Sequence, residues 1–209
     1  MSKIFKYETF NPYIFALIPK GAKVLDVGCA TGLLGKKLRK EKDPEFLAGI
    51  ESSPGIAREA KKFYDQVVVA DIESKKTLSF KKEVFDVIVC GDILEHLKNP
   101  LSVLKNLTRY LSEEGFFLIS VPNVAFASIR LSLLFGRFDY NPDGGLLDET
   151  HLRFFTYKSL VNLLRKAGLK IVFVRGYNLV RPRFFFLKVL GALFPNLFSI
   201  QFLAKARKK

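Results

Sequence analysis

The strongest constraint on the fold is the run Val-Leu-Asp-Val-Gly-Cys-Ala-Thr-Gly at residues 24–32. It reads as a buried strand that ends in a glycine-containing turn and leads into a helix from Leu33 to about Lys40. A turn of this kind brings backbone N–H groups close to a ligand at the carboxyl edge of a parallel sheet. The run therefore predicts an α/β domain with a ligand site above the end of its first strand.

The spacing of the small residues separates three kinds of turn. A phosphate-binding loop needs Lys and then Ser or Thr after its last glycine, whereas Gly32 is followed by two leucines. A dinucleotide-binding turn needs a small residue at its sixth position, where this chain has Leu33. The pattern Gly28-x-Ala30-x-Gly32, preceded by Asp26, instead resembles motif I of class I S-adenosylmethionine (SAM) methyltransferases.

The resemblance extends over roughly Pro12 to Lys209 and implies that residues 1–209 form a single class I methyltransferase domain. The implied fold class is α/β: a Rossmann-like, seven-stranded, mostly parallel sheet with an antiparallel seventh strand and helices on both faces. The alternation of apolar runs with helical patterns agrees with this fold. Strands are expected at 24–27, 46–50, 66–70, 85–90, 115–121, 170–174 and 198–206, and helices at 33–40, 54–64, 100–111, 124–135 and 157–167.

A carboxylate lies in or just beyond the end of each of the first four expected strands, and the carboxyl ends of parallel strands meet at one edge of a sheet. An acidic residue about 20 positions after a glycine turn typically holds ribose hydroxyls, and Glu51 has this position. In the methyltransferases that the chain resembles, the Asp71 position accepts a hydrogen bond from the adenine amino group and the Ile72 position packs on the ring. SAM is the implied cofactor, and its expected ligands are Asp26, Gly28, Cys29, Ala30, Gly32, Glu51, Ser52, Asp71, Ile72, Gly91 and Asp92.

A second cluster of polar residues follows the fourth expected strand. Asp92, Glu95 and His96 are spaced so that one helical turn would present them on one side, and His151 is the other histidine of the chain. The pattern resembles ubiquinone-pathway O-methyltransferases and small-RNA 3′-end ribose methyltransferases, although both prefer Glu at the Asp92 position. The resemblance implies a site for Mg or Mn formed by Asp92, Glu95, His96 and His151, where the ion would lower the pKa of an acceptor hydroxyl.

The alternative is that His96 only orients its loop and that catalysis uses no metal. Asp92, His96 and His151 are then the expected catalytic residues, with His151 the first choice for general base. The expected reaction transfers the SAM methyl group to a hydroxyl of a small molecule, a glycan or a lipid-linked acceptor. RNA ribose methylation, N-methylation, and SAM binding or membrane-surface binding without catalysis stay open as alternatives.

Three segments are interpreted as covers of the site. Residues 1–20 are expected to form an N-terminal flap over the cofactor, and residues 123–150 and 177–197 are expected to be insertions that contact the substrate or act as lids. The stretch from Gly136 to Thr156 also resembles a group of bacterial methyltransferases associated with cell-surface polysaccharide and glycosyltransfer pathways.

The charge of the chain suggests its partners. The net charge is +14, and no Asp or Glu follows Arg175. This balance favours polyanions or anionic lipid surfaces. Because no recognised RNA-binding module is present, nucleic acid is less favoured than peripheral contact between an anionic membrane and the Phe-rich residues 183–194. No apolar run has the length of a signal peptide or a membrane span, so a cytoplasmic location is expected, and Cys29 and Cys90 are expected to be buried free thiols.

Overall fold

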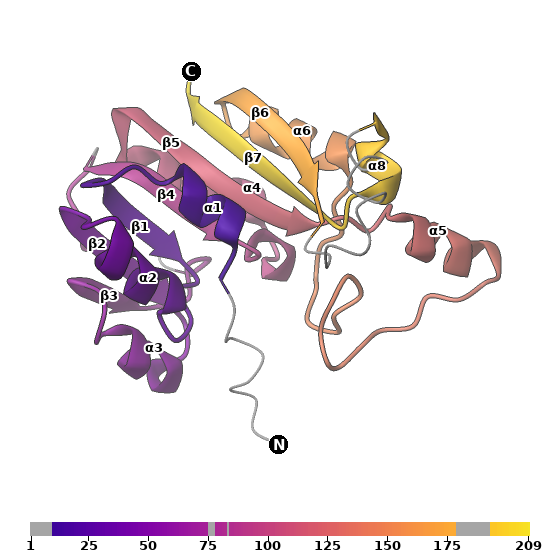
Figure 1. Ribbon diagram of the computed structural model, residues 1–209, viewed down its shortest axis with the longest axis horizontal. Coiled ribbons are helices and arrows are strands. Elements are labelled where there is room, and N and C mark those ends of the chain that lie inside the picture. The colour runs from indigo at the N-terminus through magenta and orange to yellow at the C-terminus, as the bar shows by residue number, and fades with distance from the viewer. Residues whose placement is uncertain (1–9, 75–77, 83, 179–192) are drawn as a thin grey trace.

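The computed structural model describes residues 10–74, 78–82, 84–178 and 193–209. These residues form one seven-stranded sheet in the order β3-β2-β1-β4-β5-β7-β6 (Figure 1). The pairs among β1 to β5 are parallel, and β7 runs antiparallel between β5 and β6. The predicted fold class is confirmed, including the antiparallel seventh strand. The strands are β1 (Lys23–Val27), β2 (Phe46–Glu51), β3 (Gln66–Val69), β4 (Phe85–Gly91), β5 (Leu111–Pro122), β6 (Leu169–Tyr177) and β7 (Gln201–Lys208).

Helices cover both faces of the sheet, as predicted (Figure 1). Side chains of α1, α2 and α3 belong to one buried apolar cluster, and those of α4 and α6 belong to another on the opposite face. In the part of the chain that the structure describes, no helix is long and apolar enough to cross a membrane. The helices are α1 (Pro12–Leu17), α2 (Leu33–Glu41), α3 (Pro54–Ala60), α4 (Pro100–Leu107), α5 (Ala127–Leu134), α6 (Tyr157–Lys166) and α8 (Pro195–Phe198), with 3₁₀ turns η2 (Leu94–His96) and η3 (Thr108–Tyr110).

Several element boundaries differ from the prediction by three or four residues, and three of them have a visible cause. α3 ends at Ala60, because the N–H of Phe63 bonds to the carbonyl of Ala60 in a turn that leads Tyr64 into the core. The helix predicted at 100–111 ends at Leu107, passes into η3 and is followed directly by β5. The seventh strand begins at Gln201 instead of residue 198, because α8 occupies the preceding residues.

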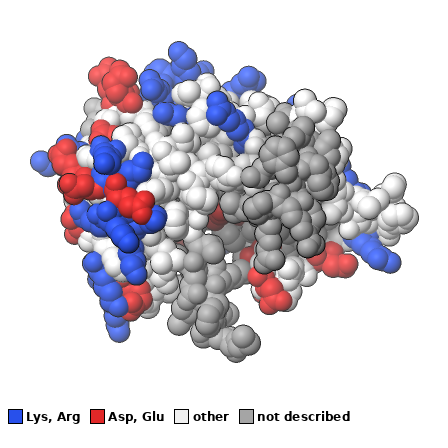
Figure 2. Space-filling view, in the orientation of Figure 1, with Lys and Arg blue, Asp and Glu red and all other residues white. Residues whose placement is uncertain are grey.

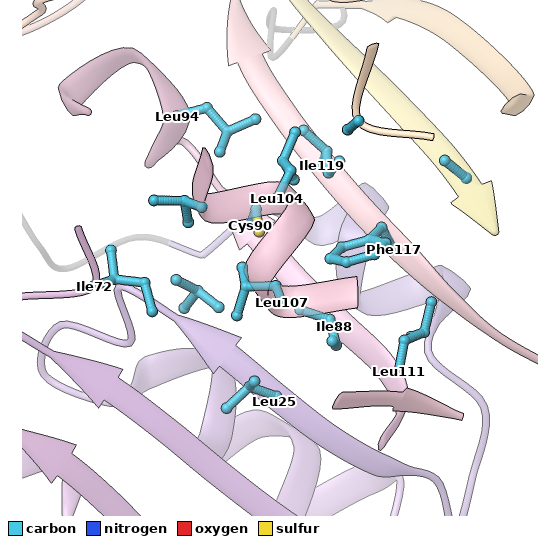
Figure 3. Close-up of a cluster of buried hydrophobic side chains, with 14 of the residues drawn as sticks. Leu25, Ile72, Ile88, Cys90, Leu94, Leu104, Leu107, Leu111, Phe117 and Ile119 are labelled. Atoms are coloured by element: carbon cyan, nitrogen blue, oxygen red, sulfur yellow. The ribbon is translucent and has the colours of Figure 1, made fainter. Parts of the chain in front are cut away.

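The larger of the two apolar clusters lies between the sheet and the helices α4 and α6. Figure 3 shows Leu25, Ile88 and Phe117, from three neighbouring strands, close to Leu107 of α4. Residues 24–27 of β1 are all buried, as expected for a parallel strand between two helix layers. Asp26 is the one polar residue among those four, so its burial needs a separate explanation.

Residues 123–155 leave the sheet after β5 and return to the same place. The N–H of Val124 donates to the carbonyl of Phe155 at 3.0 Å, and Asn123 forms an isolated parallel bridge with Phe155. α5 lies within this excursion and projects from the body of the molecule (Figure 1). Thr156 then begins α6 with a capping box that it shares with Ser159. The excursion therefore returns His151 to the carboxyl edge of the sheet.

Two of the expected covers lie partly outside the described residues. The structure describes the N-terminal segment from Phe10 onward. Of the insertion predicted at 177–197, residues 179–192 lie outside the described part, and so does all but the end of the Phe-rich segment 183–194. The roles of these segments stay predictions.

Candidate active site

The glycine turn after β1 has the backbone conformation that its sequence requires. Gly28, Ala30 and Gly32 have φ angles of +76°, +47° and +88°, in the left-handed region that favours glycine. The N–H of Gly28 donates to the carbonyl of Ile50 at 2.8 Å, which fastens the turn to the end of β2. A Cβ at Gly32 would lie 2.8 Å from the Cα of Ala60, so a side chain there would push α3 away from the turn. The turn is therefore held between β2 and α3.

Glu51, the last residue of β2, braces this turn. Its Oε2 accepts a hydrogen bond from the N–H of Ala30 at 3.1 Å, and its Oε1 accepts from the N–H of Ser53 at 2.9 Å. The hydroxyl of Ser52 donates to the same Oε1 at 3.3 Å. A carboxylate held by backbone donors keeps further lone pairs that can accept hydrogen bonds from ligand hydroxyls.

Asp26 is buried beside this turn. The hydroxyl of Tyr64 donates to its Oδ2 at 2.6 Å. Burial raises the pKa of Asp26 from 3.8 to about 6, the hydrogen bond from Tyr64 opposes that shift, and the charge of Glu51 adds to it. Because burial disfavours the charge of this carboxylate, the site favours a cationic ligand group, which would stabilise the ionised form.

A cavity lies above the carboxyl ends of β1 and β4. Six of the predicted cofactor ligands line it: Asp26, Gly28, Cys29, Ala30, Gly91 and Asp92. It is closed on another side by Phe10, Asn11 and Ile14 of the N-terminal segment and by Leu33, Leu34 and Val89. Apolar residues such as Val89 and Leu34 could not be predicted as lining, because in the sequence they have the same pattern as core positions.

The remaining predicted cofactor ligands lie outside the lining of this cavity. Glu51 binds the backbone of the glycine turn, and Ser52 donates to Glu51. Gly32 is the N-cap of α2. Asp71 is exposed, and its carboxylate accepts hydrogen bonds from the N–H of Glu73 and the hydroxyl of Ser74, which lower the pKa of Asp71. Ile72 is buried in the larger apolar cluster. The predicted adenine contacts of Asp71 and Ile72 stay predictions.

Asp92 occupies a strained position at the end of β4. Its φ angle is +51°, and its Oδ1 accepts hydrogen bonds from the Ser120 hydroxyl at 2.8 Å and from the Gln201 amide at 3.1 Å. Burial raises the pKa of Asp92, and these two hydrogen bonds and the neighbouring His96 oppose the increase. The carboxylate is thus held between β5 and β7, on the wall of the cavity.

Three residues of the second predicted cluster come together, and Asp92 is not among them. Ligand atoms of Glu95, His96 and His151 all lie within 4.8 Å of one another, and the two imidazole rings are 4.9 Å apart between centroids. The expectation that one helical turn would also present Asp92 on this side is wrong in geometry. The turn η2 begins only at Leu94, and the left-handed backbone of Asp92 directs its carboxylate to Ser120.

Glu95 is the most deeply buried member of this cluster, with 1% of its surface exposed. Among the residues that the structure describes, its Oε2 has no hydrogen-bond partner. Burial raises the pKa of Glu95 well above its usual range, and the charges of Asp92 and Asp148 raise it further. The site therefore favours the neutral form of the Glu95 carboxyl, and Oε2 is a polar atom available to a ligand.

The tautomer of His96 follows from its contacts with Thr150. Its Nδ1 lies 3.2 Å from the Thr150 carbonyl and 3.1 Å from the Thr150 hydroxyl, which itself donates to Asp148 at 2.7 Å. A carbonyl only accepts hydrogen bonds, and the hydroxyl hydrogen is directed to Asp148, so Nδ1 carries the proton. This assignment leaves the lone pair of neutral His96 on Nε2.

The glycine turn and the carboxylates at the ends of successive parallel strands are typical of α/β enzymes that bind nucleosides. Residues 6–174 match the methyltransferase domain family, and the chain belongs to that family as a SAM-dependent methyltransferase. It is 25% identical over 164 residues to a ubiquinone biosynthesis O-methyltransferase of Coxiella burnetii, covering 76% of this chain and 68% of that protein. A protein of the same description from Histophilus somni is 33% identical over 121 residues, which are 54% of this chain and 50% of that protein.

Solved structures share the fold. A SAM-dependent methyltransferase from Archaeoglobus fulgidus superposes with a TM-score of 0.66 at 19% identity, over 97% of this chain and 96% of that one. A protein from Thermotoga maritima described as a possible histamine N-methyltransferase gives a TM-score of 0.63 at 19% identity, over 94% and 86%. At these identities the likeness shows the fold alone.

SAM is the methyl donor that the family implies, and the cavity has groups suited to it. The buried carboxylate of Asp26 faces the cavity and suits the cationic methionine end of SAM. Glu51, braced at the end of β2, suits the ribose hydroxyls. The contacts of individual residues with the cofactor remain predictions.

Proposed function

We propose that this methyltransferase transfers the methyl group to a hydroxyl oxygen, with the acceptor bound beside Glu95, His96 and His151. The observation that carries the proposal is the tautomer of His96, whose Nδ1–H faces Thr150. An alcohol or phenol is a weak nucleophile until it loses its proton, whereas a neutral amine needs no base to attack. A histidine with one nitrogen fixed and the other available suits the hydroxyl better. The similar proteins from Coxiella and Histophilus are described as O-methyltransferases.

The proposed chemistry depends on orientation and on one proton transfer. Bound SAM would supply a methyl group on a positively charged sulfur, a good leaving group. The Nε2 of His96 takes the proton of the acceptor hydroxyl, so that the oxygen can accept the methyl group that bound SAM would supply, with S-adenosylhomocysteine as the leaving group. Thr150, held in turn by Asp148, keeps the ring in the required tautomer. The Oε2 of Glu95, buried and without a hydrogen-bond partner among the described residues, hydrogen-bonds to the acceptor and helps to position it.

This geometry moves the first choice of general base from His151 to His96. His151 is buried, and its ring packs against His96 and Phe154. In the proposal it forms the wall against which the acceptor lies. Asp92 contributes as a positioned charge at the boundary between the cofactor cavity and the histidine pair.

The donor set fits Mg or Mn poorly. These ions prefer several carboxylate oxygens, but Asp92 is held by Ser120 and Gln201, so Glu95 is the one carboxyl of the cluster. Two imidazoles and one carboxyl remain. We therefore propose base catalysis by His96 and assign no step to a metal. Methyl transfer should persist after EDTA treatment. Strict dependence on added Mg or Mn would show that catalysis uses a metal ion.

The test compares two His96 variants on a panel of acceptors containing phenols, catechols, sugars and alkyl glycosides, with primary amines as the competing class. Release of S-adenosylhomocysteine is measured. His96→Asn keeps a donor near the Nδ1 position and removes the base nitrogen, so turnover should fall roughly a hundredfold or more. His96→Gln keeps a polar atom near the Nε2 position and tests whether a donor there is enough.

Affinity for S-adenosylhomocysteine, measured by calorimetry, should be unchanged in both variants, because His96 does not line the cofactor cavity. Transfer to amines alone would overturn the proposal. If His151→Asn lost turnover while His96→Asn kept it, the base would be His151 and only the assignment of the residue would change.

A further inference from the structure

α5 exposes more apolar surface than a helix in contact only with water normally does. Leu134 and Phe135 are 78% and 70% exposed, and Leu131 and Leu133 are exposed as well. The helix buries a single side chain, Ile129. Apolar side chains occur on all of its sides, and a helix of that composition is usually covered by protein or lipid. In Figure 1 it projects away from the sheet.

The apolar surface continues onto the segment before α8. Leu193 and Phe194 are also exposed. The Arg130 guanidinium reaches the carbonyl of Asn196 at 3.5 Å, and the Asn123 side chain donates to the same carbonyl at 3.2 Å. These bonds fasten α8 to the base of α5. We call the six exposed residues the α5 surface: Leu131, Leu133, Leu134, Phe135, Leu193 and Phe194.

The charges around this surface are basic. Residues 123–138 contain Arg130 and Arg137 and no acidic residue, and no acidic residue follows Arg175. Arg130 and Arg137 are both exposed. The first carboxylates beyond α5, Asp139 among them, lie in the loop that leads back to the sheet. Figure 2 shows basic side chains mainly at the left and top of the visible face, mixed with acidic ones, and a further basic group at the lower right with acidic groups near it; the net charge of the whole chain is +14.

We propose that the α5 surface docks into the interface of a membrane that contains anionic lipids. Leucine and phenylalanine side chains enter the boundary between headgroups and acyl chains, while arginines next to them meet the lipid phosphates. The charge of the whole chain favours this occupant over a second copy of the chain, since two copies of net charge +14 repel each other and an anionic surface attracts either one.

The same docking orients the enzyme. The excursion that carries α5 leaves and rejoins the sheet at its carboxyl edge, where Val124 bonds to Phe155. His151 lies in the returning part of this excursion. The membrane would therefore lie on the acceptor side of the site, a consequence that rests on the proposed function, whereas the docking itself does not.

The test is sedimentation of the full chain with vesicles made of equal parts of phosphatidylcholine and phosphatidylglycerol, with pure phosphatidylcholine vesicles as reference. The double variant Leu134→Glu/Phe135→Glu should bind the anionic vesicles at least about tenfold more weakly than the wild type, because two apolar side chains no longer enter the interface. Val172→Glu is the matched control, since Val172 is half-exposed on β6, away from α5, and this variant should bind nearly as the wild type does.

The melting temperature and the affinity for S-adenosylhomocysteine should be unchanged in both variants, which separates docking from folding and from the cofactor site. Equal vesicle binding by the two variants would overturn the proposal, as would wild-type protein that stays in the supernatant. A wild-type dimer that dissociates in the double variant would identify a second copy of the chain as the occupant and would also overturn it. Equal binding to the two kinds of vesicle would contradict the proposed attraction between the arginines and anionic lipids.

Discussion

Tyr64 donates a 2.6 Å hydrogen bond from its hydroxyl to the carboxylate of Asp26, and both side chains are buried. The same hydroxyl accepts a hydrogen bond from the N–H of Gly35 at 3.1 Å, so Tyr64 joins the end of β1 to α2. Asp26 lines the cofactor cavity. The fold thus holds the Asp26 carboxylate where burial disfavours its charge, and the hydrogen bond from Tyr64 favours the ionised form.

Asp26→Asn should stabilise the protein in the absence of cofactor and weaken cofactor binding. The pKa of Asp26 is raised from 3.8 to about 6 on folding, so its stabilising contribution is complete below pH 3.8 and is lost as the pH rises through about 6. A shift of this size corresponds to at most about 3 kcal/mol at pH 7.5. Urea unfolding at pH 7.5 should show a gain of roughly 1–3 kcal/mol. Asp139→Asn, a change of an exposed carboxylate, should leave stability unchanged.

Calorimetry with S-adenosylhomocysteine supplies the other half of that prediction. Asp26→Asn should lower the affinity at least tenfold, about 1.4 kcal/mol, because the neutral amide cannot pair with an ammonium group. A variant that is more stable and binds as well as the wild type would show that Asp26 has no role in binding.

Tyr64→Phe should move the pH dependence of cofactor binding upward. The hydrogen bond from Tyr64 opposes the rise in the pKa of Asp26, so its removal raises that pKa above about 6. The affinity of the wild type for S-adenosylhomocysteine should fall as the pH drops through about 6, and in the variant this decline should begin at a higher pH. Superimposable profiles from pH 5 to 8 would mean that Asp26 does not control the titration.

Gly35→Ala should destabilise the protein although alanine is the better helix former. A Cβ at Gly35 would lie 2.3 Å from Cε2 of Tyr64, so the ring must move and its bond to Asp26 is lost. We expect a loss of about 1–3 kcal/mol in urea unfolding, together with weaker binding of S-adenosylhomocysteine. Gly55→Ala in α3 is the control, because nothing lies within 4 Å of its added Cβ. It should be neutral or slightly stabilising; equal losses in both variants would contradict the argument.

The sequence was sufficient for the sheet and for the glycine turn. The strands near the centre of the sheet are apolar runs buried on both faces, and Gly28 and Gly32 mark a turn whose φ angles few other residues adopt. Both patterns depend only on residues that are adjacent in the sequence, so they can be recognised without the structure. The antiparallel last strand came from the resemblance, which the sheet confirms, whereas the order of the strands is seen only in the structure.

The second cluster shows where sequence reasoning failed. Spacing placed Asp92 with Glu95 and His96, but Asp92 is held by Ser120 and Gln201, which are 28 and 109 positions away. No local pattern predicts a left-handed residue that is fixed by two distant strands. The tautomer of His96 likewise depends on Thr150, 54 positions further along the chain.

A side-chain hydrogen bond of Asn11, the residue before α1, connects this helix to Tyr177 of β6. Loss of this bond should loosen the N-terminal segment that lines the cofactor cavity. Its Oδ1 accepts from the N–H groups of Tyr13 and Ile14 at 3.0 and 3.2 Å, while its side-chain amide donates to the hydroxyl of Tyr177. The rings of Tyr13 and Tyr177 lie 4.7 Å apart between centroids. Asn11 and Ile14 line the cavity, so this bond fixes the cover in place.

Asn11→Ser keeps a good helix cap but is too short to reach Tyr177, and Tyr177→Phe removes the same bond from the other side. Each variant should release S-adenosylhomocysteine about fivefold faster than the wild type, as expected for the loss of roughly 1 kcal/mol. The double variant should be little worse than either single variant, because both remove one interaction. Stopped-flow dissociation measures all three, and rates equal to that of the wild type would mean that α1 does not retain the cofactor.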